Sequence, residues 1–162
     1  MAKVGRAARV ASRQRVESIT ADKTITSGET GELYLVDQAG GSVTITLPDL
    51  QDGAYFKFVI PKDQTAMDSK KITIQSAASG TANGELVGSC LIVLDGGSTA
   101  MGTHQLANQG DGHPQFIIES THAADDLFAG STVDVWCDGT RWYVKAELRT
   151  NQARLIGKFH GS

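Results

Sequence analysis

Beyond the first twenty residues, apolar and polar positions alternate with a period of two over several short segments. In SVTITLP, Val43, Ile45 and Leu47 fall on one face of an extended chain and the threonines on the other, and Pro48 ends the segment. The segments AYFKFVI and KITIQS repeat this pattern. Clusters of glycine, proline, aspartate and serine bound the segments, which is typical of half-buried β-strands.

The number of such segments indicates the fold class. In GELYLVD both faces are apolar, and we expect Leu33 and Leu35 to point inward. DQAGGS, which follows, has the composition of a hairpin connection, and PDLQDG links the next two strands. With roughly eight to eleven short strands, the chain is expected to form a single all-β domain, a β-sandwich or a jelly-roll-like fold. The predicted core consists of Leu33, Leu35, Val43, Ile45, Leu47, Phe56, Phe58, Ile72, Ile74, Val133, Val135, Trp142 and Val144.

The segment STVDVWCDGTRWYVKAEL predicts a β-hairpin. Asp138–Gly139 is a strong two-residue loop signal, because glycine adopts a positive φ at almost no cost. With this loop, Val135 lies opposite Trp142. A loop at Gly139–Thr140 is the alternative, which shifts every pair by two residues and keeps the same faces.

Trp136 and Tyr143 lie together on the outer face of this hairpin. With the Asp138–Gly139 loop, Trp136 faces Arg141 rather than Tyr143. We expect the two aromatic residues to form a cross-strand ladder or a contact between subunits. A ligand platform is the alternative, since such rings offer an apolar body and a polar tip.

The chain is less regular between residues 90 and 130. CLIVLD at 90–95 is a short apolar run, consistent with a strand buried on both faces. The segment 96–114 is rich in glycine, serine, asparagine and histidine, and its lack of periodicity predicts a long functional or mobile loop. THAADDLFAG predicts one or two turns of helix that end at Gly130.

Charge is divided unevenly along the chain. Residues 1–20 have a net charge of +4, residues 21–148 of -10 and residues 149–162 of +3. We therefore divide the chain into a basic N-terminal arm, residues 1–19, and a β-rich body, residues 20–162. The basic residues of the arm are Lys3, Arg6, Arg9, Arg13 and Arg15.

Such an arm indicates a negatively charged partner. A helix would align Arg6, Arg9 and Arg13, but it would be marginal in water, so we expect the arm to order on its partner. A frayed, solvated terminus is the alternative. Nucleic acid is disfavoured, because the arm has no aromatic residue to stack on bases and the acidic body repels phosphates. An acidic protein surface, including that of a neighbouring copy, is favoured because arginine pairs with carboxylates in bidentate geometry.

No motif in the sequence indicates catalysis. A nucleophile elbow, a phosphate-binding loop, a zinc-protease motif and a dinucleotide fingerprint are all missing. His104, His113 and His122 are spaced nine apart, which is not a usual metal-ligand spacing, and Asp125 and Asp126 lack the pattern of an EF-hand. The chain is therefore expected not to be an enzyme and to use no cofactor or metal, with a surface calcium ion at Asp125 and Asp126 as the alternative.

The cysteine content and the hydropathy add two further expectations. Cys90 and Cys137 are too few for a disulfide framework or a zinc site, and we expect both to be buried free thiols. No apolar run approaches the ~20 residues that a membrane helix needs, so no membrane partner is expected.

Three segments together resemble virion proteins of tailed bacteriophages. They are the opening GELYLVDQAGGSVTITLPDLQDGAYFKFVI, the terminal hairpin VWCDGTRWYV and the leader GRAARVASRQRVE. The leader is most similar to head-decoration (capsid cement) proteins of marine tailed phages. The resemblance covers nearly the whole chain in style, and no functional residue is carried over from it.

This resemblance implies a β-rich homotrimer on the outside of an icosahedral capsid, where it clamps adjacent capsomers. The implied partners are the major capsid protein and further copies of the chain. The implied location is the outer capsid surface of a virion, after synthesis in the host cytoplasm. The alternative is a tail-fibre or receptor-binding tip that recognises host-surface glycans, with residues 96–114, Trp136 and Tyr143 as its candidate surface.

Overall fold

The computed structural model describes residues 14–38, 40–65, 67–77, 86–94, 102–104, 113–120, 126–151 and 156–160. Within these residues the chain is all-β, as predicted, with strands in two mixed sheets and one short 3-10 helix. No helix in this part of the chain is long and apolar enough to cross a membrane. The elements are β1 (Val16–Ile19), β2 (Lys23–Thr24), η1 (Ser27–Glu29), β3 (Leu33–Val36), β4 (Val43–Thr46), β5 (Tyr55–Val59), β6 (Ile72–Gln75), β7 (Leu86–Leu94), β8 (Gly102–His104), β9 (Gln115–Glu119), β10 (Thr132–Cys137), β11 (Trp142–Thr150) and β12 (Ile156–His160).

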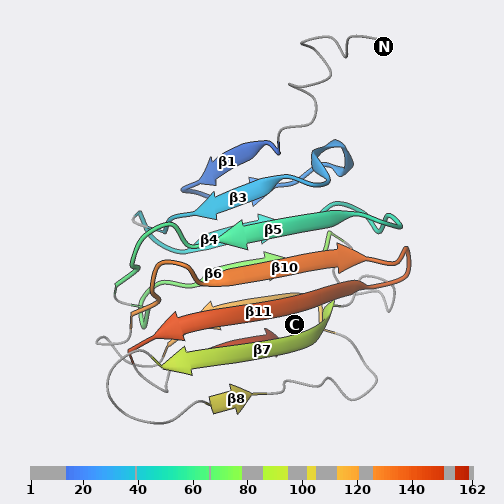
Figure 1. The fold of residues 1–162 in the computed structure, drawn as a ribbon. Coiled ribbons are helices and arrows are strands. Elements are labelled where there is room, and N and C mark those ends of the chain that lie inside the picture. Colours follow the sequence, from blue (N-terminus) through green and yellow to red (C-terminus); the bar gives the residue numbers. More distant parts are fainter. Residues whose placement is uncertain are drawn as a thin grey trace, which may run out of the picture.

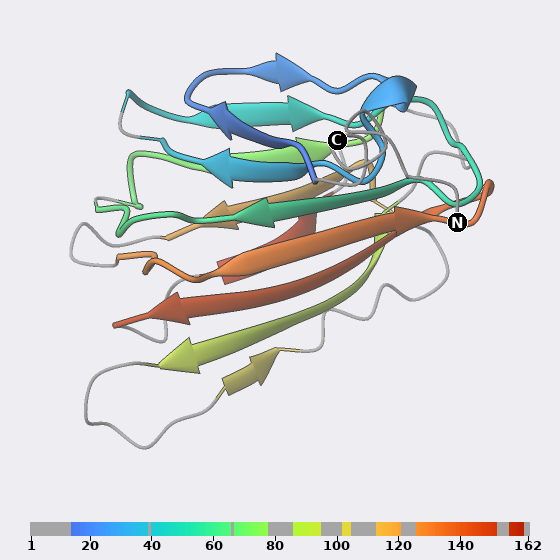
Figure 2. The same cartoon turned by 45° about the horizontal axis from the view of Figure 1, so that its top comes forward.

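The two sheets lie one behind the other. The seven-stranded sheet has the order β1-β3-β5-β10-β11-β7-β8, and it faces the viewer in Figure 1 with β1 at its top edge. The five-stranded sheet has the order β12-β9-β6-β4-β2, and Figure 2 shows its strands in the second layer.

Successive strands alternate between the sheets from β1 to β7. Neighbours within a sheet, such as β1 and β3 or β4 and β6, are therefore separated along the chain by a strand of the other layer. A chain that returns to the same layer after such a crossover runs parallel to its previous strand, and these pairs are indeed parallel. From β1 to β6 the chain thus passes back and forth between the two sheets and adds one parallel strand to each sheet in turn.

This winding corrects the prediction of a hairpin at DQAGGS. The segment joins β3 in the seven-stranded sheet to β4 in the five-stranded sheet. Turn-forming residues indicate where a chain reverses, but they do not indicate whether the next strand pairs in the same layer. The predicted hairpin at Asp138–Gly139 does join two paired strands, β10 and β11.

One hydrophobic core lies between the sheets, with side chains from both. The seven-stranded sheet contributes Phe56 and Trp142, whose ring centroids are 5.9 Å apart, and the five-stranded sheet contributes Ile45, Ile74 and Phe116. All predicted core residues are buried except those of β3. Alternation with one apolar face was therefore sufficient to predict which side chains are inside.

The prediction for β3 is wrong, because Tyr34 and Val36 are fully buried while Leu33 and Leu35 are only half-buried. The parallel register places Tyr34 beside Phe58, and the two rings stack at 5.4 Å. Tyr34 can accept this position because its hydroxyl donates to Glu29 Oε1 at 3.4 Å. Both faces of β3 are apolar, so periodicity could not decide between them.

The register of the β10–β11 hairpin is the alternative one, with the loop at Gly139–Thr140. Trp136 lies opposite Tyr143, and Val135 lies opposite Val144. The Asp138 N–H donates to the Arg141 carbonyl at 3.3 Å and closes the hairpin there. The predicted faces are retained, since the shift is two residues.

Three further predictions concern the less regular region between residues 90 and 130. β7 is buried on one face only, through Cys90 and Ile92, while the other face of its sheet includes the exposed Ser89. Residues 126–130 are not helical, since Leu127 instead forms backbone bridges with Gln64 and Thr150 on two sides. Residues 121–125 and most of 96–114 lie outside the described residues, although β8 lies within the predicted loop. The two cysteines are buried free thiols, as predicted.

Candidate partner-binding surfaces

Three aromatic side chains form a row across the outer face of the seven-stranded sheet. Tyr55 on β5, Trp136 on β10 and Tyr143 on β11 occupy neighbouring register positions. The rings of Trp136 and Tyr143 are stacked, with centroids 5.7 Å apart and planes 15° from parallel. Trp136 is 40% exposed and Tyr55 is 36% exposed, and among the large hydrophobic side chains of the described residues only Val16 is more exposed than these two. We call Tyr55, Trp136 and Tyr143 the aromatic row.

Both tyrosine hydroxyls of the aromatic row are bound within the chain. Tyr55 donates to Asp134 Oδ1 at 2.6 Å, and Tyr143 donates to Asp138 Oδ2 at 2.8 Å. Partial burial, followed by the Asp134 hydrogen bond, raises the pKa of Tyr55 to about 12, and the hydrogen bond to Asp138 raises the pKa of Tyr143. These hydrogen bonds already restrict the two tyrosine side chains, so the chain loses less side-chain entropy when a partner covers them.

The loop between β10 and β11 positions one end of the aromatic row. Asp138 Oδ1 accepts hydrogen bonds from the backbone N–H groups of Thr140 and Arg141 and from the Thr140 hydroxyl, at 2.7–2.9 Å. These donors, with the Thr140 hydroxyl first, hold the pKa of the Asp138 carboxyl well below its usual range. Gly139 adopts φ 86°, which a side chain would disfavour. One carboxylate thus shapes the turn and orients Tyr143.

The sequence predicted two members of the aromatic row and missed the third. Trp136 and Tyr143 lie on the outer face as expected, and the structure brings them into direct contact. The period of AYFKFVI does place Tyr55 outward, but nothing in the sequence shows that β5 pairs with β10. Tyr55 and its partner Asp134 are 79 residues apart along the chain.

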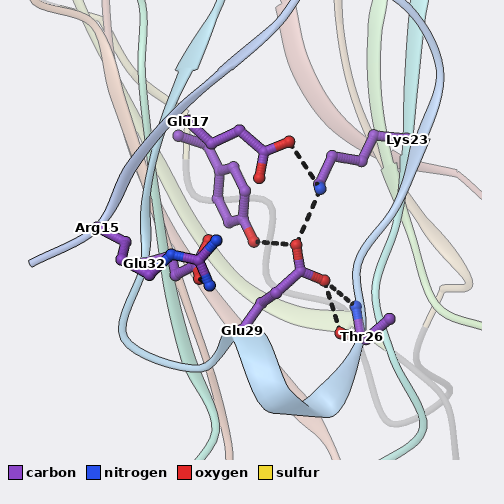
Figure 3. Close-up of polar contacts among 7 residues, drawn as sticks. Arg15, Glu17, Lys23, Thr26, Glu29 and Glu32 are labelled. Atoms are coloured by element: carbon purple, nitrogen blue, oxygen red, sulfur yellow. Dashed lines mark hydrogen bonds and ion pairs between the residues drawn. The ribbon is translucent and has the colours of Figure 1, made fainter.

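A second polar surface lies where the chain enters the sheets. Figure 3 shows Lys23 between Glu17 of β1 and Glu29 of η1, with Glu32 nearby against Arg15. The ligand oxygens of the three glutamates lie within 4.8 Å of one another, and we call these residues the glutamate cluster. Lys23 Nζ donates to Glu17 Oε1 and to Glu29 Oε1, both at 2.8 Å. These hydrogen bonds, with that to Glu17 first, raise the pKa of Lys23.

Glu29 is the most strongly bound carboxylate of the cluster. Its Oε2 accepts from the backbone N–H of Thr26 at 2.6 Å and from the Thr26 hydroxyl at 2.7 Å. Burial by itself would raise the pKa of Glu29, but the hydrogen bonds from Lys23 and Thr26 outweigh it and lower the pKa to about 2. Glu29 is therefore ionised throughout the physiological range.

Of the basic arm residues, Arg15 is the one that the structure describes. Its Nη1 lies 2.8 Å from Glu32 Oε1, while the Arg15 side chain is 75% exposed. Lys3, Arg6, Arg9 and Arg13 lie outside the described residues. Residues 16–19, which were assigned to the arm, form β1 and pair with β3 in the seven-stranded sheet. Arg15, the last basic residue of the arm, therefore lies beside the glutamate cluster.

We expect no metal site at the histidines, and the structure describes three of the four histidine positions. His104 and His160 belong to β8 and β12, His113 forms a bridge with Leu86, and His122 lies outside the described residues. Within the described ranges, the glutamate cluster is the one group of three or more acidic, histidine or cysteine side chains whose ligand atoms are spaced closely enough to share a metal ion. It was not predicted, because its members are separated by strands and turns with no motif spacing.

The chain matches no protein-family model, no curated protein and no solved structure. The function of the chain is therefore inferred from its own surfaces and from the sequence resemblance.

Proposed function

We propose that this protein is a structural component of a tailed-phage virion that binds the outside of the icosahedral capsid and bridges adjacent capsomers. In this proposal the chain is a homotrimer, its partner is the major capsid protein, and its two sheets form a β-sandwich. It has no catalytic role. The observation that carries the proposal is the aromatic row, because it is a partly exposed aromatic surface on the outer face of a sheet, with both tyrosine hydroxyls bonded within the chain.

The aromatic row supports a contact between protein surfaces. Exposed aromatic residues are enriched where proteins bind one another, and a centre of Trp and Tyr side chains supplies much of the affinity. The half-buried Leu33 and Leu35 lie on the same outer face and extend its apolar character toward β1. A cyclic assembly buries such a surface on every subunit, and the resemblance to decoration proteins points to three subunits.

The charge distribution supports an electrostatic contribution from the arm. Residues 1–13 contain four basic side chains and no acidic one, and Arg15, which follows them, is paired with Glu32 of the body. An assembly with several arms dissociates only when all of them are released at the same time, so modest contacts accumulate. We propose that Lys3, Arg6, Arg9 and Arg13 contact carboxylates of the capsid protein or of a neighbouring copy.

The test separates assembly from capsid binding. Light scattering at micromolar concentration should give the mass of a trimer, and Trp136→Ala should shift it toward the monomer, whereas Lys145→Ala on the same face of β11 should not. Purified protein should co-sediment with undecorated capsids, and removal of residues 1–13 should weaken this binding and reduce its salt dependence. A wild-type monomer that does not bind capsids would contradict the proposal.

A receptor-binding tip is the second candidate, and the same aromatic row favours it. Exposed Trp and Tyr rings also stack on the apolar faces of sugars. Adsorption to host cells, lost in Trp136→Ala and combined with no affinity for capsids, would favour this function over decoration.

A further inference from the structure

Three carboxylates from different elements meet at one end of the two sheets. Glu17 lies on β1, Glu29 ends η1 and Glu32 directly precedes β3. One oxygen atom of each lies within 4.8 Å of the other two. Two oxygen ligands of one calcium ion, each at about 2.4 Å, lie at most about 4.8 Å apart. The spacing of the glutamate cluster is therefore compatible with three ligands of a single ion.

Glu32 provides a second, independent indication of a ligand. The residue is 4% exposed, and its Oε2 is buried with no hydrogen-bond partner. Arg15 binds only the other oxygen, Oε1. A buried carboxylate oxygen without a partner is costly, because it has lost its water and gained nothing in exchange. Since Glu32 already reaches the other two carboxylates, a bound cation would supply the missing contact.

We propose that Glu17, Glu29 and Glu32 bind a divalent cation of the calcium class, which takes the place of the Lys23 ammonium group. All three ligands are carboxylates, the donors that Ca²⁺ prefers, whereas Zn²⁺ sites favour histidine and cysteine. Mg²⁺ would demand a near-octahedral arrangement and release its water reluctantly. Ca²⁺ tolerates an irregular shell completed by water.

The cation must displace the Lys23 ammonium group, because this group is bound to the carboxylates of Glu17 and Glu29 that would bind the ion. Lys23 Nζ is 2.8 Å from both Glu17 Oε1 and Glu29 Oε1, so an ion bound there would be repelled by it. The Lys23 side chain is 20% exposed, and its flexible stem allows the charged group to move out to solvent. Lys23 thus acts as an internal competitor that lowers the affinity of the site.

The ion would connect three elements at the root of the basic arm. It would hold β1 to η1 and to the start of β3, while Arg15 remains on the opposite oxygen of Glu32. This inference is independent of the proposed function, since all of its residues belong to a single chain.

The test titrates CaCl₂ into the full-length protein, freed of metal with EDTA, and follows heat release and the thermal unfolding temperature. We expect wild type to bind Ca²⁺ and to unfold at higher temperature with it. Lys23→Met should bind about tenfold more tightly, because the competing charge is gone. Glu32→Gln should lose binding, and Glu147→Gln, an exposed glutamate of β11, should behave as wild type. MgCl₂ should have a weaker effect.

Two results would overturn the proposal. The first is that CaCl₂ releases no heat of binding and leaves the thermal unfolding temperature unchanged in both wild type and Lys23→Met. This result does not depend on whether Glu32→Gln folds. The other is a Glu32→Gln protein that binds Ca²⁺ as wild type does.

Discussion

Lys23→Met is expected to destabilise the metal-free protein at neutral pH, and the loss is expected to shrink in acid. Lys23 Nζ donates to two carboxylates of the glutamate cluster at 2.8 Å each. Methionine keeps much of the length of the side chain and removes its charge. Three carboxylates then remain close together, with Arg15 on one of them as the compensating cation.

Glu29 sets the magnitude of this effect. Its pKa lies at about 2 instead of 4.5, because the hydrogen bonds from Lys23 and Thr26 outweigh the opposing effect of burial. At about 1.4 kcal/mol per pKa unit, the full shift corresponds to about 3.5 kcal/mol of stability at neutral pH. Lys23 lowers this pKa more than any other group does, so its removal is expected to reduce the free energy of unfolding by about 2 kcal/mol.

The pH dependence follows from the direction of the shift. The pKa of Glu29 is lower in the folded than in the unfolded state, so its stabilisation is complete above pH 4.5 and is lost as the pH falls from 4.5 toward 2. The difference between wild type and Lys23→Met should therefore fall to less than about half between about pH 7 and about pH 2.5.

Urea unfolding in EDTA, followed by the fluorescence of the buried Trp142, measures this difference at each pH. Lys145→Met, which removes an exposed lysine of β11, is the matched control and should change the stability by less than about 0.5 kcal/mol. A loss that is independent of pH, or no larger than that of Lys145→Met, would refute the electrostatic role of Lys23.

Three further predictions test the packing. Tyr34→Ala should lower the free energy of unfolding by about 3–5 kcal/mol, whereas Leu33→Ala, at a half-buried position, should lower it by about 1 kcal/mol. A larger loss for Leu33→Ala than for Tyr34→Ala would mean that Leu33 faces the core, as predicted from the sequence. Gly88→Ala should lose at least about 3 kcal/mol, since a Cβ there would lie 1.8 Å from the Val144 carbonyl oxygen; wild-type stability would contradict the parallel β7–β11 pairing. Burial raises the pKa of the Cys90 thiol to about 12, so a thiol reagent at neutral pH should react with it only after unfolding, and rapid labelling of the native protein would contradict its burial.

The sequence by itself determined the class of the fold and most of the core. Segments such as SVTITLP have one apolar and one polar face, so burial of Val43 and Ile45 follows from the two-residue period of an extended chain. The same rule placed Trp136 and Tyr143 on the outer face, and it did so in either hairpin register. These properties are local, because each depends only on neighbouring residues.

Only the tertiary structure decided how these strands are combined. The orientation of β3 depends on the register that places Tyr34 beside Phe58, and the aromatic row depends on the pairing of β5 with β10. The glutamate cluster likewise requires β1, η1 and the start of β3 to meet. Alternation tells which side of a strand is apolar but carries no information about its neighbours, since strand pairing is selected by the packing of the whole core.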